Sequence, residues 1–278
     1  MIEILIAALA GLLLGSFLNV CIFRLPYDIS VMNPARSFCP KCDETIAWYD
    51  NVPLLSYIVL RGKCRHCRAV ISWRYPLVEL LTAIFFGLAV WQSGVSWVAL
   101  KKCLFAFICI DLIFTDFEER ILPDEFTKGG TILGILIAAM VPQTAVISYL
   151  LFPVMLPEWG RSMLESTVSA LLCSGSLYGI SVVYKKIRNR EGMGLGDIKM
   201  IAMMGAFLGL MPTLFSLMVG SFMGSLSGVA FIYIAKKDSA SYELPFGSFL
   251  GIAALGIAFF GPQYSTIHFD SYNRATAN

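Results

Sequence analysis

Four of the eight cysteines form two Cys-x-x-Cys pairs, Cys39 with Cys42 and Cys64 with Cys67. Two such pairs about twenty residues apart can supply four thiolates to one tetrahedral site, as structural zinc requires. Two disulfides are the alternative, and they require an oxidising compartment. Because four sulfurs leave no open position for water, a metal bound here is expected to organise the segment and not to perform hydrolysis.

Two aspartates beside apolar segments are candidates for acid–base chemistry. Asp116 follows one apolar run, and Asp197 follows the glycine-rich stretch 192–196 and precedes another run. A carboxylate at mid-bilayer costs about 2.5–3.5 kcal/mol on insertion scales, so each one needs a reason. Two carboxylates that share a site cannot both ionise easily. One keeps a proton while the other can activate water, as in an aspartyl protease.

Simpler interpretations of these acidic residues stay open at this point. Asp197 could be the N-cap of the helix that follows it. Asp111 lies deeper in the same run as Asp116 and on another side of it, and we expect it to satisfy a polar partner within the bundle. Asp124 follows Pro123, and we expect it to cap the next helix.

The composition indicates which elements must position these residues. Of the 278 residues, 57% are hydrophobic and 14% are charged, whereas a soluble domain has about 25% charged residues. A soluble enzyme is therefore excluded, and a lipid bilayer is the expected surrounding. The net charge of +2 indicates no nucleic-acid partner. The apolar runs are Ile4–Phe23, Leu77–Trp91, Val98–Thr115, Phe126–Val141, Met163–Tyr184, Ile198–Leu210, Thr213–Ala235 and Phe246–Phe260.

The charges predict how these runs are oriented. The first run ends at Arg24, so the positive-inside rule places its N-terminus outside and Arg24 in the cytoplasm. The basic segment 24–76 is then cytoplasmic, where thiols stay reduced, and zinc is favoured over disulfides. Counting crossings from an outside N-terminus puts Asp116 and Asp197 at the cytoplasmic face, at the ends of different helices.

These observations predict an all-α polytopic membrane protein with about eight transmembrane helices and a small cytoplasmic zinc-binding loop module. The expected division is a first transmembrane helix at 1–23, the basic module at 24–76, a seven-helix membrane core at 77–264 that carries both aspartates, and a polar tail at 265–278. Glycines that recur on one helical face are expected to allow close helix packing; they are Gly205, Gly209, Gly220, Gly224 and Gly228.

The chain resembles the prepilin peptidases, the bacterial type IV leader peptidases. Gly194-Leu195-Gly196-Asp197 matches their Gly-x-Gly-Asp motif, and the paired cysteines and the spacing of Asp116 and Asp124 match as well. Further matching stretches run from the first helix to the last: Gly15–Val20, Trp48–Pro53, Arg74–Glu79 and Pro245–Gly247.

The resemblance implies a bifunctional enzyme in the bacterial inner membrane. It would cut the leader from type IV prepilins, or from pseudopilins of type II secretion, on the cytoplasmic side, with Asp116 and Asp197 as the catalytic pair. It would then N-methylate the new first residue with S-adenosylmethionine. The methyltransferase half has no motif that can be interpreted independently, and the cytoplasmic loop with Glu79 beneath it is the place to look for that site.

Two other functions remain open. One is a peptidase-only intramembrane protease with the Gly-x-Gly-Asp motif, although such relatives lack the paired-cysteine loop. The other is a zinc-stabilised membrane carrier or assembly factor without enzymatic activity. A carrier needs carboxylates near mid-bilayer on facing helices, whereas most of the carboxylates here lie at one interface.

Overall fold

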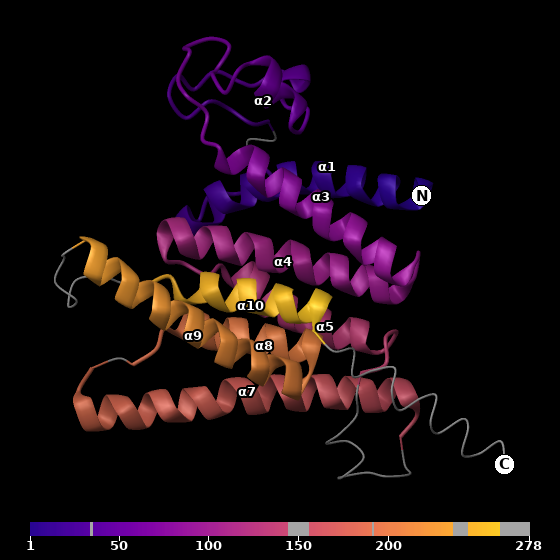
Figure 1. Ribbon diagram of the computed structural model, residues 1–278, viewed down its shortest axis with the longest axis vertical. Coiled ribbons are helices and arrows are strands. Elements are labelled where there is room, and N and C mark those ends of the chain that lie inside the picture. The colour runs from indigo at the N-terminus through magenta and orange to yellow at the C-terminus, as the bar shows by residue number, and fades with distance from the viewer. Residues whose placement is uncertain (34–35, 144–155, 191, 236–243, 262–278) are drawn as a thin grey trace. The chain divides into compact units, whose positions relative to one another are not determined.

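The computed structural model describes residues 1–33, 36–143, 156–190, 192–235 and 244–261 (Figure 1). Within these ranges the chain is helical and has no β-strand, which confirms the predicted all-α class. The predicted polar tail at 265–278 lies outside the described residues. Contacts divide the chain into two compact units, Met1–Pro123 and Asp124–Asn278, and each is considered by itself.

Eight long helices in the described part of the chain correspond one to one to the predicted apolar runs. They are α1 Ile2–Arg24, α3 Arg74–Ser93, α4 Trp97–Glu119, α5 Asp124–Ala138, α7 Glu158–Arg188, α8 Leu195–Leu208, α9 Leu210–Ala235 and α10 Phe246–Phe260. Four segments, Ile2–Tyr27, α3, α7 and Leu210–Phe231 of α9, are long and apolar enough to cross a membrane, and α10 is a shorter apolar helix. The chain is therefore a multi-pass membrane protein.

The first unit depends on close contact between α1 and α3. A Cβ atom at Gly11 would lie 2.7 Å from the Cα of Ala83, and one at Gly15 would lie 2.7 Å from the Cα of Glu79. Both distances are shorter than any side chain tolerates, so the two helix backbones touch. The helix α4 packs against both of these helices.

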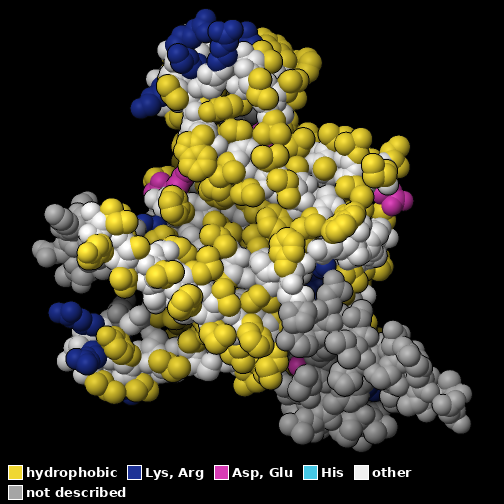
Figure 2. Space-filling view, in the orientation of Figure 1, with side chains coloured by type: hydrophobic (Ala, Val, Ile, Leu, Met, Phe, Trp, Pro, Cys, Tyr) yellow, Lys and Arg dark blue, Asp and Glu magenta, His cyan; other side chains and the backbone are white. Residues whose placement is uncertain are grey.

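The segment between α1 and α3, residues 25–73, is called the cysteine module and belongs to the same unit. It contains two short 3-10 turns, Leu25–Tyr27 and Trp48–Asp50, and the one-turn helix α2, Leu55–Val59. Lys and Arg side chains gather on this module, whereas hydrophobic side chains dominate the visible surface of the helices (Figure 2). The basic residues that are exposed on it are Arg36, Lys41, Arg61, Lys63, Arg65 and Arg68.

The second unit is arranged around α8, which contacts α5, α7, α9 and α10. A Cβ atom at Gly205 would lie 2.9 Å from the Cα of Ala170, and one at Gly220 would lie 3.0 Å from the Cα of Leu250. These two glycines therefore have the predicted packing role. Gly209 does not: its φ of +83° ends α8, and α9 begins at the next residue.

The contact between α1 and α3 can be tested with matched Gly→Ala substitutions. In an exposed helix, alanine is favoured over glycine by about 1 kcal/mol. We expect Gly15→Ala to lower stability by about 1–3 kcal/mol instead, because its Cβ meets backbone. Gly87→Ala, whose Cβ would lie 3.6 Å from its nearest neighbour, serves as the control. Thermal unfolding in detergent measures both, and equal midpoints would contradict the packing described here.

Candidate metal centre and active site

The two cysteine pairs lie in turns with the same backbone hydrogen bonds. The N–H of Cys39 donates to the carbonyl of Glu44, and the N–H of Cys64 donates to the carbonyl of Ala69, five residues on in each case. Each turn is closed by an isolated antiparallel bridge. The residue after each pair is left-handed, with φ of 54° and 58°. The module thus repeats one turn with an offset of 25 residues.

The four sulfurs of these turns converge. Their Sγ atoms all lie within 4.8 Å of one another, and Cys39 and Cys67 are 3.9 Å apart. Tetrahedral zinc with Zn–S bonds of about 2.3 Å spaces its sulfurs by about 3.8 Å. None of the four is in a disulfide. The cluster therefore has the donor set and the spacing to hold a zinc ion, as the sequence predicts.

The local electrostatics also favour a cation at this cluster. Backbone N–H groups of Cys67 and His66 lower the pKa of the Cys64 thiol to about 7. At Cys42 the N–H of Glu44 acts in the same direction, but burial and the thiols of Cys39 and Cys67 outweigh it, and the pKa rises to about 12. Neighbouring thiolates repel one another, and a divalent metal removes that repulsion.

Two contacts hold the segment between the cysteine pairs. Arg65 donates two hydrogen bonds, of 2.5 and 2.7 Å, to the carboxylate of Asp50. The guanidinium therefore lowers the pKa of Asp50. Further along, the backbone N–H of Leu54 donates to a carboxylate oxygen of Glu79 at 2.8 Å. The segment is thus attached both to the second cysteine pair and to α3.

Asp116 lies in the last turn of α4, in the first unit. Its residue is 6% exposed, and Arg120, which ends the helix in a left-handed conformation, donates to its backbone carbonyl. Asp111 is five residues earlier on the same helix and is fully buried. The Thr115 hydroxyl donates to the backbone carbonyl of Asp111, so this part of α4 is polar inside the unit.

Asp197 lies in the first turn of α8, in the second unit. Gly194 occupies the N-cap position, so the interpretation of Asp197 as the N-cap is wrong. The carboxylate of Asp197 lies over this glycine, with Oδ2 3.3 Å from where a Cβ of residue 194 would be. Gly194 therefore leaves room for the carboxylate, and the positive end of the helix dipole favours its charge. Because the two aspartates belong to different units, their pairing stays a prediction.

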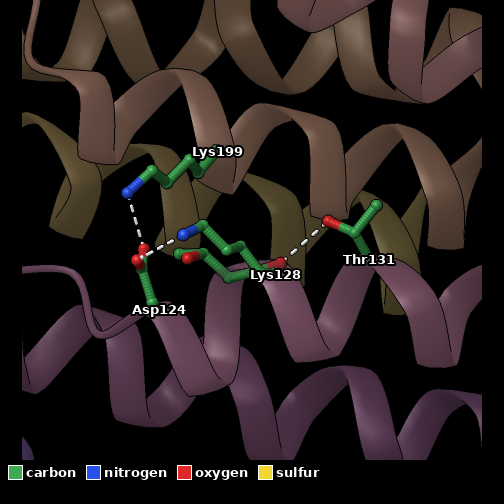
Figure 3. Close-up of polar contacts among 5 residues, drawn as sticks. Asp124, Lys128, Thr131 and Lys199 are labelled. Atoms are coloured by element: carbon green, nitrogen blue, oxygen red, sulfur yellow. Dashed lines mark hydrogen bonds and ion pairs between the residues drawn. The ribbon is translucent and has the colours of Figure 1, made fainter.

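A three-residue charge cluster ties the start of α8 to the start of α5 (Figure 3). Asp124 is the first residue of α5, and its carboxylate accepts hydrogen bonds of 2.6 Å from both Lys128 and Lys199. The carboxylate thus forms ion pairs with these two lysines. Lys199 stands two residues after Asp197, a signal that sequence reasoning missed.

Two family models match the chain, one over the cysteine module and one over both aspartates. The model of the Bacterial Peptidase A24 N-terminal domain matches residues 9–93, which contain the cysteine module. The model of the Type IV leader peptidase family matches residues 103–229, which contain both aspartates. No solved structure matches the chain.

Several curated relatives have the name prepilin leader peptidase/N-methyltransferase. The one from Neisseria gonorrhoeae is 34% identical, with 81% of this chain and 80% of the relative covered. Those from Stutzerimonas stutzeri and Pseudomonas aeruginosa are 32% and 30% identical, each with 94% of this chain and 91% of the relative covered. Similarity of this extent shows the family: the chain is a member of the type IV leader peptidases.

Proposed function

We propose that this protein is a bifunctional membrane enzyme that removes the leader from type IV prepilins or type II secretion pseudopilins and N-methylates the new N-terminal residue. The observation that carries the proposal is the similarity, along most of the chain, to relatives named prepilin leader peptidase/N-methyltransferase. The presence of both aspartates and of the four-cysteine cluster supports it.

The cleavage step is assigned to Asp116 and Asp197. One aspartate is ionised and takes a proton from the attacking water, while the other is protonated and donates to the carbonyl oxygen of the scissile peptide. Collapse of the tetrahedral adduct breaks the C–N bond, and the leaving amine takes up a proton. The place of Asp197 at a helix N-terminus supports it as the ionised partner.

The methylation step uses S-adenosylmethionine, which supplies an electrophilic methyl group when it is bound. The active site is proposed to face the cytoplasm of a bacterium, with the protein in the inner membrane, because the basic side chains gather on the cysteine module. Zinc held by the four cysteines has a structural role in this proposal.

Substitution of the aspartates tests the cleavage assignment. Asp116→Asn and Asp197→Asn should each insert into the membrane but reduce cleavage of a co-purified prepilin by about 10²–10⁴-fold, because each removes an acid–base group. Mass spectrometry of the product reads both cleavage and N-methylation. Asp111→Asn is the control and should still cut; continued cleavage by Asp116→Asn or Asp197→Asn would refute the assignment.

Elemental analysis tests the metal site. The purified protein should carry about one zinc per chain, and Cys39→Ser or Cys64→Ser should lose it, because three thiolates and a hydroxyl bind zinc more weakly. Cys109→Ser is the matched control, since this thiol is fully buried in α4 and outside the cluster. A metal-free preparation that retains full activity would rule the zinc site out.

The lysine that bridges to Asp124 is expected to position Asp197. Lys199→Gln should lower kcat for cleavage by about tenfold or more and leave KM nearly unchanged, because a small displacement of a catalytic group is costly. The acidic limb of the kcat–pH profile should shift as well, which a purely structural role would not produce. Lys128→Gln removes the other contact of Asp124 and is the control; equal effects of the two variants would argue against this role.

A further inference from the structure

The first unit contains a cavity of about 480 Å³. Its walls come from the cysteine module, from α1 and α3, and from the last turn of α4. Sites for small molecules have volumes of about 300–1,000 Å³. Neither Asp116 nor Asp197 lines it. The cavity is therefore the right size for a ligand and is separate from the aspartates assigned to cleavage.

Asn19 is one of the residues that line this cavity, and it has a buried acceptor. The residue is 3% exposed, and its amide nitrogen donates to the carbonyls of Gly15 and Tyr75. Carbonyls only accept hydrogen bonds, so the amide atom that bonds them must be the nitrogen. The other amide atom is therefore the oxygen, Oδ1. That oxygen has no hydrogen-bond partner among the described residues. A buried acceptor of this kind calls for a donor from a ligand or from water.

Arg74 also lines this cavity, and it has a buried donor. The residue is 7% exposed, its Nη1 pairs with the carboxylate of Glu118, and its guanidinium lies 4.6 Å from the ring centre of Tyr75. Its Nε has no partner within the described part of the chain. Tyr75 follows Arg74 in the chain, and its carbonyl accepts a hydrogen bond from the amide of Asn19. The unsatisfied groups of Arg74 and Asn19 therefore lie in one region of the wall.

Glu79 adds a buried carboxylate to the lining. It is 8% exposed, and its carboxylate accepts hydrogen bonds from the N–H of Leu54 and from the side chain of Ser16. A carboxylate that is buried to this extent is stabilised by a cation or by several donors. The cavity therefore offers acceptors at Asn19 and Glu79 and a cationic donor at Arg74, which is the complement of an ammonium group next to a carboxylate.

We propose that this cavity binds the methyl donor and that its amino-acid end is held by Asn19, Glu79 and Arg74. The inference rests on the methyltransferase activity proposed above. Asn19 and Glu79 accept hydrogen bonds from the α-ammonium group, and the Nε of Arg74 donates to the α-carboxylate. The adenosyl end lies against the apolar and aromatic part of the lining, which includes Phe38 and Tyr57.

Calorimetric titration of the full-length, zinc-loaded protein in detergent tests this site. The probe is S-adenosylhomocysteine, which has the amino-acid end but no methyl group to transfer. Glu79→Gln keeps an acceptor for Leu54 but loses the charge, and Arg74→Lys keeps a cation for Glu118 but loses Nε. Each should weaken binding by about tenfold or more, because charge-assisted hydrogen bonds are lost. Glu3→Gln, on an exposed turn of α1, is the matched control and should bind normally.

A second probe, 5′-methylthioadenosine, has the same nucleoside thioether without the amino-acid end. It should bind the wild-type protein more weakly, and neither Glu79→Gln nor Arg74→Lys should change its affinity. Both variants should carry about one zinc per chain and unfold cooperatively on heating, which shows that they are folded. Equal weakening for the two probes would overturn the assignment of these residues to the amino-acid end.

The outcomes separate this inference from the function on which it rests. If the wild-type protein methylates prepilin and both variants bind S-adenosylhomocysteine normally, the donor site lies elsewhere and only the inference fails. If the wild-type protein cleaves prepilin but neither methylates it nor binds the probe, the methyltransferase function fails together with the inference.

Discussion

At Gly11 and Gly15 the backbones of α1 and α3 touch, and no side chain fits between them. In a bilayer the surrounding lipid is as apolar as the helices, so packing of this kind is what holds helices together. The same contact brings Asn19 to the carbonyl of Tyr75 and presents Glu79 next to it. The second unit uses the same principle where Gly205 meets Ala170 and Gly220 meets Leu250.

Close packing also decides where polar groups are tolerated. The carbonyls at the end of α8 would be unsatisfied in lipid, and side chains from outside the helix bond them: Ser166 and Gln143 both donate to the carbonyl of Ala206. Elsewhere buried polar side chains lie at helix ends, as Asp116 and Arg74 do, and also inside helices, as Asp111 does. Backbone polar groups must be paired inside a membrane, and the side chains at the end of α8 pair them there.

Much of the fold could be predicted from the sequence, because a helix that crosses lipid needs a run of about 20 mainly apolar residues. Eight apolar runs became eight helices in the described residues, and the cysteine spacing led to the four-sulfur cluster. Contacts between distant residues could not be predicted in this way. The bond between Lys199 and Asp124 joins residues 75 positions apart, and no local pattern encodes it. Gly209 was misjudged for the same reason, since a packing glycine and a turn glycine differ only in φ.

The repeated cysteine turns have a mechanical consequence for the segment between them. One metal ion would fasten both ends of that segment, much as a disulfide closes a loop, and would reduce its conformational freedom. Leu54, whose N–H bonds Glu79, lies within the closed loop. Such a cross-link opens when the metal is withdrawn, without the reduction that opening a disulfide needs. Withdrawal of the metal would therefore loosen the segment that contacts α3 through Leu54 and Glu79.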